Sequence, residues 1–249
     1  MLNFDPKSVN PRLIESAARQ AARATHDVLR DHPFPPTPVG MPVSVPGGPG
    51  GYNRVREMTL EELLLENRVV FLVGEINHVS AARVIMQMLY LQSIKRDADI
   101  NFYINSPGGA VDDTLAIYDI MNFIGCDVAT YCIGRAESGG AIAFMAGKKG
   151  KRFILPNAKV MIHQPFGGVY GQTTDIQIQA DEILKTKQTL IEIMSKCTGQ
   201  STDRVREDSE RDRFFSAQEA VRYGICDEVI GADSSAAAQD AAANANKPK

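Results

Sequence analysis

The chain has 249 residues, 44% of them hydrophobic and 23% charged, which is typical of a globular domain with a sizeable core. A formal net charge of −3 gives no basis for nucleic-acid binding, and the apolar runs are shorter than the roughly 18 residues that span a bilayer. The four cysteines lack the spacing of a zinc site and, without a signal peptide, indicate reduced thiols in the cytoplasm.

Proline divides the chain. Nine of the 13 prolines lie in residues 1–49, so residues 1–51 are predicted to be an N-terminal extension with an extended linker. Within it, the alanine-rich residues 11–30 fit a short helix, a propeptide or a targeting segment. Residues 232–249 are small and polar and predict a disordered tail. The folded domain is therefore predicted over residues 52–231.

Apolar runs alternate with helical patterns along the folded part. Short β-branched or aromatic runs predict strands at residues 69–73, 100–104, 127–133, 153–155 and 160–162. Apolar residues at helical spacing predict helices at residues 80–95, 112–123 and 138–146. This alternation indicates an α/β fold with mostly parallel strands.

A longer helix is predicted over residues 174–196, after a glycine-rich segment. At about 23 residues it would be some 35 Å long, about the width of a small domain. Its apolar residues cover more than one stripe, which suggests an arm used for oligomerisation. A helix packed on the core is the alternative.

Ser138 lies in the segment GRAESGGA, between a predicted strand and a predicted helix. The neighbouring glycines allow a tight turn, and N–H groups at a helix N-terminus can stabilise an oxyanion. Ser138 is therefore a candidate nucleophile. The alternative is a serine that only caps the helix.

Two other segments hold a candidate base and a candidate orienting residue. His163 follows the strand at residues 160–162, whereas the other histidine of the folded part, His78, lies at the start of a helix. Asp212 lies in the charged run ERDRF, which fits a solvated surface equally well. A Ser, His and Asp set is recognised by geometry rather than by chain order, so the sequence predicts a serine hydrolase if the three meet.

The segment NSPGG, residues 105–109, also ends a strand and precedes a helix. Ligand sites of open α/β sheets lie at the carboxyl ends of strands. The N–H of Gly109 could therefore complete an oxyanion hole with that of Gly139. An ordinary turn before a helix is the alternative.

In order and spacing these segments resemble the Clp protease proteolytic subunit family (ClpP, caseinolytic peptidase P). The resemblance covers about residues 63–230 and rests on the segments LLLENRVVFLVG, YINSPGG, GRAESGGA, KGKRFILPNAKVMIHQP, GQTTDIQI, TGQS and ERDRFFSAQEAVRYGICDEVI. It implies an α/β fold of the crotonase-like type, a spiral of ββα units. A projecting handle, a strand plus a long helix, would span residues 167–196.

The resemblance implies an ATP-dependent serine endopeptidase that hydrolyses unfolded polypeptides and small peptides in protein quality control. Ser138 would be the nucleophile, His163 the base and Asp212 its orienter, with the N–H groups of Gly109 and Gly139 forming the oxyanion hole. The subunit would need no metal or other cofactor, because ATP is used by a partner AAA+ unfoldase.

The resemblance also implies a homo-oligomer of two stacked heptameric rings, a tetradecamer, in the cytoplasm. Arg211 would form ion pairs between the rings, and residues 1–51 would include a propeptide and an axial loop. Neither nucleic acid nor membrane is an expected partner. The unfoldase would dock on apolar positions that correspond here to Tyr103, Phe123, Tyr131, Ile133, Phe153, Leu155 and Ile230.

Two positions depart from the family pattern. Asn101 replaces an aromatic residue of the docking surface, and Glu137 stands directly before the nucleophile, where the family usually has a small residue. The Glu137 carboxylate either changes the proton affinity of His163, alters the substrate pocket or points away. Because Glu137 stands beside the nucleophile, a catalytically silent or weakly active ring subunit of the same family stays an alternative function. A crotonase-fold acyl-CoA enzyme is a further alternative.

Overall fold

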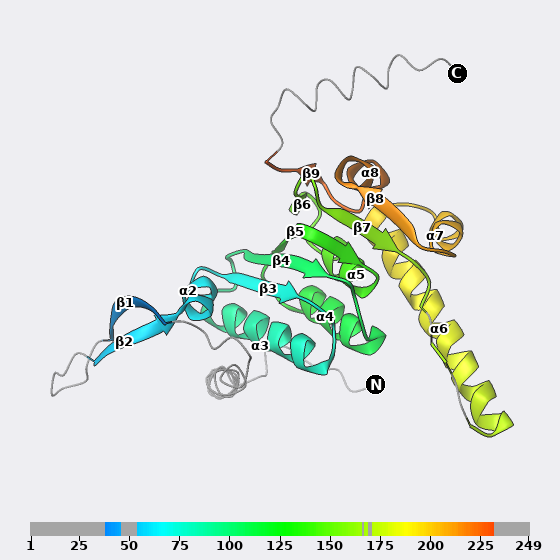
Figure 1. The fold of residues 1–249 in the computed structure, drawn as a ribbon, viewed down its shortest axis with the longest axis horizontal. Helices are drawn as coiled ribbons and strands as arrows, with labels where there is room; N and C mark the ends of the chain where they lie inside the picture. Colours follow the sequence, from blue (N-terminus) through cyan, green and yellow to red (C-terminus); the bar gives the residue numbers. More distant parts are fainter. Residues whose placement is uncertain (1–37, 46–53, 166, 169–170, 232–249) are drawn as a thin grey trace, which may run out of the picture.

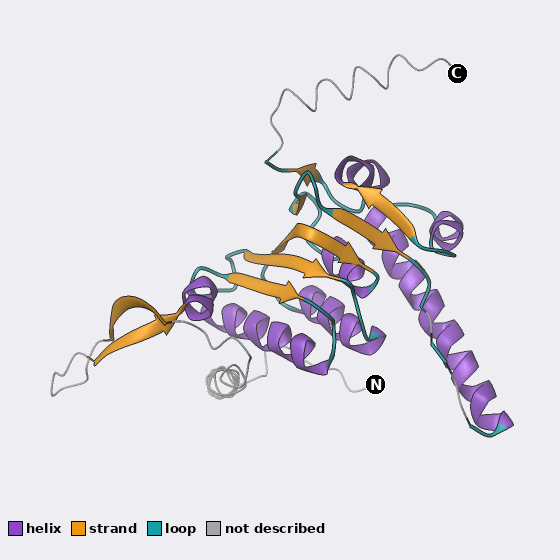
Figure 2. Cartoon of the chain, in the orientation of Figure 1, coloured by secondary structure: helices purple, strands orange, loops and turns teal. Residues whose placement is uncertain are grey.

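The computed structural model describes residues 38–45, 54–165, 167–168 and 171–231. The main body is a seven-stranded sheet with helices packed against it, as Figures 1 and 2 show. Its strands are β3 (Val69–Val73), β4 (Ile100–Ser106), β5 (Val128–Glu137), β6 (Arg152–Ile154), β7 (Lys159–Ile162), β8 (Arg213–Ser216) and β9 (Glu228–Val229). The path β3-β4-β5-β6-β9 is parallel throughout.

The helices of the described residues are α2 (Leu60–Glu66), α3 (His78–Ile94), α4 (Val111–Phe123), α5 (Gly139–Met145), α6 (Thr173–Thr198), α7 (Thr202–Asp208) and α8 (Ala217–Tyr223). Helices α3 and α4 lie side by side along β3 and β4 (Figure 1). Alternate residues of β4, such as Phe102 and Ile104, are fully buried in the core. The predicted α/β alternation is therefore confirmed.

Strand β5 is longer than its sequence predicts. The expected strand ended at Ile133, but β5 continues past Gly134 to Glu137. A Cβ at position 134 would lie 2.8 Å from Oδ1 of Asn105, so this glycine allows a close approach between strands rather than ending one. The first part of β5 pairs with β6 and its last three residues pair with β7.

Helix α6 has 26 residues, so it is about 39 Å long. It extends well beyond the sheet in Figure 1, and it ends at Gly199, whose φ of 79° is the left-handed conformation that glycine favours. The predicted long helix is confirmed. The handle was also expected to contain a strand, but the described residues between 163 and 172 form none. A strand requires a pairing partner, and no other described segment of this chain pairs with these residues.

A two-stranded antiparallel sheet precedes the main body, made of β1 (Pro38–Val45) and β2 (Arg54–Thr59). Strand β1 lies within the stretch for which the sequence predicted only an extended linker. Its prolines are tolerated because Pro38 is the first residue of the strand and Pro42 follows a break in the register after Val39. The rest of the predicted extension and the predicted tail lie outside the described residues.

Candidate active site

The strand registers bring the three candidate catalytic segments together. Ser138 follows the end of β5, whose last residue pairs with Met161 of β7. His163 follows the end of β7, which is parallel to β5. Strand β8 is antiparallel to β7 and begins at Arg213, opposite Ile162, so Asp212 lies beside His163.

The side chains of the three residues form one hydrogen-bonded chain. Nε2 of His163 lies 2.8 Å from Oγ of Ser138, and Nδ1 lies 3.0 Å from Oδ1 of Asp212. Ser138 is half-buried, while the Asp212 side chain is 61% exposed in this single chain. The geometry is that of a serine hydrolase, in which a carboxylate orients an imidazole that accepts the serine proton.

Ser138 adopts an unusual backbone conformation. Its φ of 54° and ψ of −122° form a combination that L residues rarely adopt and that tends to persist only where the surroundings enforce it, often at functional sites. The Ser138 N–H donates to the carbonyl of Met161 at 2.9 Å, which fixes the turn. Its side chain makes no capping hydrogen bond to α5, so the interpretation of Ser138 as only a helix cap is wrong.

The NSPGG segment packs against the nucleophile turn. A Cβ at Gly108 would lie 2.7 Å from Cβ of Ser138, so only glycine allows this approach. Gly109 and Gly139 both line the pocket that contains Ser138 and His163. Gly139 is the first residue of α5, and the N–H of a first helical residue has no partner within its helix.

The pocket at Ser138 has a volume of about 30 Å³. Its wall includes Thr114 of α4, which the sequence reasoning missed. The signal was available in its periodicity, because Thr114 occupies a core-facing position of the predicted helix.

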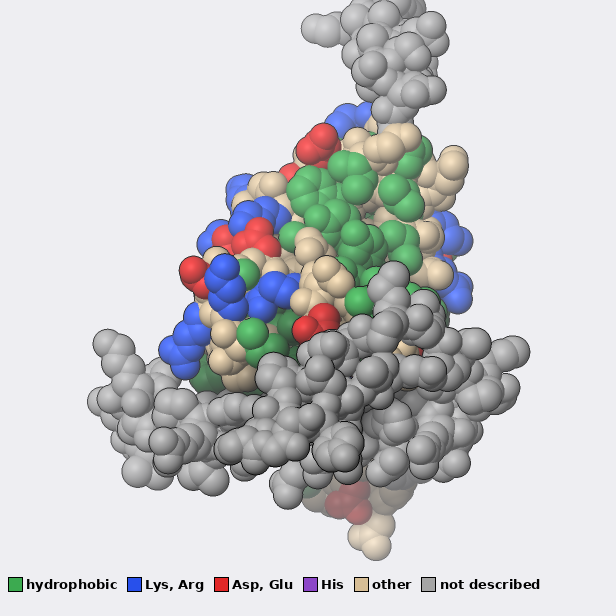
Figure 3. All heavy atoms as spheres, turned by 90° about the vertical axis from the view of Figure 1, so that its left-hand side faces the viewer, with side chains coloured by type: hydrophobic (Ala, Val, Ile, Leu, Met, Phe, Trp, Pro, Cys, Tyr) green, Lys and Arg blue, Asp and Glu red, His purple; other side chains and the backbone are tan. Residues whose placement is uncertain are grey.

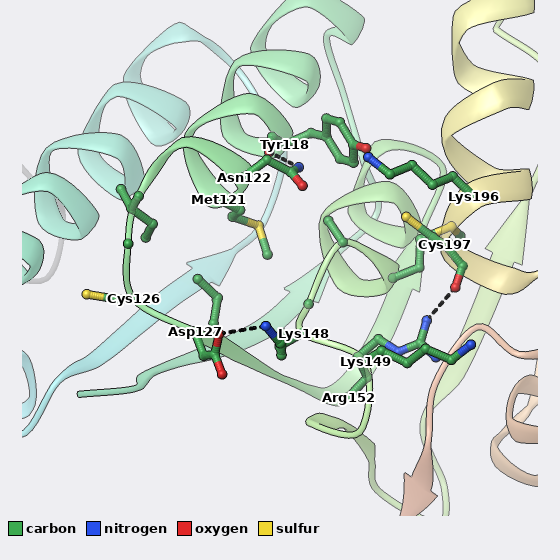
Figure 4. A pocket seen from close by; sticks show the side chains of 16 residues that line it. Tyr118, Met121, Asn122, Cys126, Asp127, Lys148, Lys149, Arg152, Lys196 and Cys197 are labelled. Carbon is green, nitrogen blue, oxygen red and sulfur yellow. Dashed lines mark hydrogen bonds and ion pairs between the residues drawn. The ribbon is translucent and has the colours of Figure 1, made fainter. Parts of the chain in front are cut away.

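A larger hollow of about 440 Å³ lies elsewhere, between the end of α4 and the end of α6 (Figure 4). It contains none of the three candidate catalytic residues. Two of its cations already have partners: Lys148 forms an ion pair with Asp127 at 3.0 Å, and Nη1 of Arg152 donates to the carbonyl of Cys197 at 2.9 Å. The chemistry therefore points to the smaller pocket.

Glu137 points away from that pocket, which it does not line. Its carboxylate forms ion pairs with Arg135 at 3.4 Å and with Lys159 of β7 at 3.2 Å. Lys159 also lies over the ring of Phe214 in β8, 5.3 Å from the ring centre. Glu137 is thus held across the strands that carry the nucleophile and the base.

The cysteine thiols do not offer an alternative nucleophile. Burial raises the pKa of Cys132 to about 11 and that of Cys226 to about 12. Burial also raises the pKa of Cys126 and of Cys197. Since a thiol reacts as the thiolate, these side chains are unreactive near neutral pH. All four are free cysteines.

The predicted docking residues lie in two places. Tyr103, Tyr131 and Phe153 stack in a row across β4, β5 and β6, with ring centres 4.5 and 5.1 Å apart, on the sheet face opposite α3 and α4. Figure 3 shows hydrophobic side chains gathered on the side of the molecule that lies to the left in Figure 1. Phe123 lies in the second place, apart from this row: it is the last residue of α4 and is 56% exposed.

The row contains a further aromatic ring that the sequence reasoning missed. Phe71 of β3 stacks on Tyr103 at 5.3 Å. The run VVFLV is apolar at every position, so the sequence alone does not reveal that Phe71 lies on the outward face. Asn101, which replaces a family aromatic, accepts a hydrogen bond from the Tyr131 hydroxyl at 3.2 Å. Ile133, Leu155 and Ile230 are half-buried.

Arg211 is exposed beside Asp212, and its predicted contact with another ring stays a prediction. Among the described residues, no group of His, Cys, Asp and Glu side chains is arranged to hold a metal ion. No helix in the same part of the chain is long and apolar enough to cross a membrane.

Comparison with known proteins decides the family. The Clp protease profile matches residues 52–233. The chain belongs to the Clp protease family. A relative from Rhodopirellula baltica (strain DSM 10527 / NCIMB 13988 / SH1), ATP-dependent Clp protease proteolytic subunit 1, is 52% identical over 179 residues, which cover 72% of this chain and 79% of the relative.

Membership of the Clp protease family confirms three predictions made from the sequence: the resemblance itself, the ClpP-like α/β fold, and activity as a serine endopeptidase. The match also spans every segment that supplies a candidate site residue. The roles of individual residues stay predictions.

Proposed function

We propose that this chain cuts unfolded polypeptides and small peptides with Ser138 as nucleophile, His163 as general base and Asp212 as its orienter. The observation that carries the proposal is the continuous hydrogen-bonded chain of the three side chains, with distances of 2.8 and 3.0 Å. The strained Ser138 turn supports it, because such strain persists at functional sites.

The reaction is acyl transfer. Oγ of Ser138 attacks the peptide carbonyl while Nε2 of His163 takes the hydroxyl proton, and Asp212 stabilises the resulting imidazolium. The N–H groups of Gly109 and Gly139 donate to the oxyanion. His163 then gives the proton to the departing amine as the C–N bond breaks. Water, deprotonated by His163, hydrolyses the ester on Ser138 and restores the enzyme.

The cycle requires no metal or other cofactor, since each proton moves through His163. ATP is used by a separate partner. The name of the Rhodopirellula relative includes "ATP-dependent" and "proteolytic subunit", which supports a second component that consumes ATP. We assign that role to an AAA+ unfoldase that feeds unfolded chains to this subunit.

The subunits would form two stacked heptameric rings around a closed chamber, with α6 in the contact between rings. Apolar side chains exposed on α6 support this arrangement, since Ile178 is 62% and Leu184 is 63% exposed. Arg211 would form ion pairs across the same contact. This arrangement would couple assembly to the position of Asp212.

The aromatic row is the proposed docking surface for the unfoldase, with Tyr103, Tyr131 and Phe153 at its centre. Phe123 lies apart from the row within one chain, so a complete docking cleft would combine the row of one subunit with Phe123 of its neighbour. Reduced thiols support a location in the cytoplasm, because all four cysteines are free. Within the N-terminal extension, removal of a propeptide is part of the same proposal.

Cleavage assays on the full chain test the proposed function. A fluorogenic peptide should be cleaved without ATP, and a folded substrate only with an AAA+ unfoldase and ATP. Ser138→Ala should lower peptide cleavage at least about 10³-fold, and electron microscopy should show two seven-membered rings. An assembled ring without peptidase activity would instead indicate a silent subunit, and hydrolysis of a thioester but no peptide an acyl-CoA enzyme.

A further inference from the structure

The Asp212 carboxylate is held by few contacts of its own. Its side chain is 61% exposed, and one of its oxygens lies 3.0 Å from Nδ1 of His163. Within the part of the chain that the structure describes, this carboxylate has no second hydrogen-bonding partner. Holding an exposed side chain in one rotamer costs conformational entropy. The backbone that carries Asp212 must therefore be fixed by other residues.

The segment that carries Asp212 is attached on both sides to the segment that carries His163. On one side, the N–H of Gln164 donates to the carbonyl of Ser209 at 2.6 Å. On the other side, Arg213 pairs with the last residue of β7. Ser209 and Arg213 are thus the two fixed points of the segment, and Asp212 lies directly before the second one.

Asp208 connects these two fixed points. It is the last residue of α7 and directly precedes Ser209. Its side chain is only 7% exposed, and Oδ1 forms an ion pair with Nη1 of Arg213. Oδ2 accepts a hydrogen bond from Nε of Arg204 at 2.7 Å, so both carboxylate oxygens are used. Separating this carboxylate from its partners would leave a buried charge unpaired, which is strongly unfavourable.

The Arg213 side chain is confined by aromatic rings as well. Its guanidinium lies over Phe215 and Tyr223, 5.1 and 5.5 Å from the ring centres. Both rings are buried and contact each other, with centres 4.8 Å apart. A planar guanidinium that stacks on rings and binds a carboxylate has a fixed orientation. Arg213 therefore holds the start of β8 in one position.

We propose that Asp208 is a positioning residue for the reaction, an inference that rests on the proposed role of Asp212 in orienting His163. Its ion pair fixes Arg213, the residue after Asp212, and its covalent neighbour Ser209 fixes the other end of the same segment. Asp208 is not among the described residues that line the Ser138 pocket. It acts on the base through the backbone of Asp212 rather than on the substrate.

Kinetics of Asp208→Asn on the assembled full chain test this role, with a small fluorogenic peptide as substrate. The kcat should fall about 10²-fold, the cost of a misplacement of about 1 Å in a catalytic group, with KM unchanged. The midpoint of the acid limb of kcat/KM should also fall. A carboxylate that is no longer held beside His163 stabilises its imidazolium less. A wild-type kcat together with a wild-type midpoint overturns the inference.

Asp203→Asn is the matched control. Asp203 lies in the same helix and pairs with Arg206 at 2.8 Å, but its side chain is 90% exposed. Because this pair is far more exposed and does not involve Arg213, the variant should keep the wild-type kcat and midpoint. An equal loss of kcat in both variants would assign the effect to α7 as a whole and overturn the inference.

The Asp212→Asn background separates positioning from a general structural effect. If Asp208 acts through Asp212, adding Asp208→Asn to this background should not further slow the labelling of Ser138 by a fluorophosphonate, since the charge that Asp208 positions is already absent. A further fall by the same factor as in the wild type would show independent action and overturn the inference.

Arg213→Met decides the question if Asp208→Asn fails to fold or assemble. It keeps an apolar stem against the two rings and leaves Asp208 paired with Arg204, and its kcat and midpoint should fall as in Asp208→Asn. Wild-type values in Arg213→Met would overturn the inference. A wild-type assembly in which Ser138 takes no label would overturn the proposed function instead, so labelling separates the two failures.

Discussion

At the scale of single residues, Glu137 is the departure from the family pattern closest to the chemistry. It precedes the nucleophile, yet its carboxylate is paired with Arg135 and Lys159 and is absent from the pocket wall. Because Arg135 and Lys159 balance its charge outside the pocket, we expect the Glu137 carboxylate to join β5 to β7 rather than to take part in catalysis. Of the three alternatives for Glu137, the structure favours a side chain that points away from the pocket.

The pH dependence of Glu137→Gln tests this interpretation. The acid limb of kcat/KM reports protonation of the general base, so its midpoint should be the same in Glu137→Gln and in the wild type. A midpoint that falls in the variant would show that the Glu137 charge stabilises the imidazolium and would contradict the interpretation. Lys159→Met is the matched control, because it removes the partner charge and leaves Glu137 in place.

At the scale of elements, a buried ion pair fixes the last strand of the sheet. Arg152 of β6 donates to both carboxylate oxygens of Asp227, at 3.0 and 2.7 Å, and the N–H of Gly150 adds a bond at 2.7 Å. The Arg152 side chain is 3% and the Asp227 side chain 19% exposed. Burial alone would raise the pKa of Asp227, but the hydrogen bonds and charge of Arg152 outweigh it and lower the pKa.

Asp227→Asn should lower the free energy of unfolding by about 3 kcal/mol, because it leaves the charge of Arg152 buried and unpaired. Urea unfolding at a fixed protein concentration measures the change. Since folding lowers the pKa of Asp227, its contribution is complete above the unfolded pKa of about 3.9 and is lost as the pH falls through the folded value. The difference between variant and wild type should therefore shrink only below about pH 4.

The control for this pair is Asp203→Asn. Asp203 pairs with Arg206 at 2.8 Å on the surface, with its side chain 90% exposed. An exposed pair within one helix contributes at most about 0.5 kcal/mol, so this variant should unfold like the wild type. Equal effects of the two variants would contradict the assignment of Asp227 as a buried anchor.

The elements show where the sequence was sufficient and where it was not. Helices α3 and α4 and strand β4 were predicted from apolar periodicity, because their buried faces repeat regularly. Strand β8 has four residues and lies next to the charged run that contains Asp212, so no periodicity revealed it. Its antiparallel register with β7 is what brings Asp212 to His163, and long-range pairing of this kind leaves no local signal.

The same limit applies to the site. Ser138, His163 and Asp212 were selected from segments whose order and spacing resemble a family. The contact of Glu137 with Lys159 depended on β5 continuing past Gly134, and the place of Thr114 in the pocket wall depended on how α4 packs on α5. Both are consequences of packing between distant segments, which a single sequence does not encode in any local pattern.

At the scale of the whole molecule, the single chain leaves apolar surface uncovered on the handle helix. Leu184 is 63% exposed on α6. Leu184→Glu should dissociate the double ring, because it places a charge in the proposed contact between rings. Sedimentation velocity should then show particles of half the wild-type mass.

Gln179→Glu is the control for the handle, because it adds the same charge at an exposed polar position of α6. It should sediment as the wild type. A Leu184→Glu protein that also sediments as the wild type would show that α6 does not join the rings.

Covalent labelling tests the central claim most directly, namely that Ser138 is the nucleophile activated by His163 and Asp212. The assembled full chain is treated with a fluorophosphonate, and the modified residue is located by peptide mass spectrometry. We predict one label per chain, on Ser138, with labelling abolished in His163→Ala and slowed by about 10⁴ in Asp212→Asn. A label on another residue, or an assembled protein that takes no label, would contradict the claim.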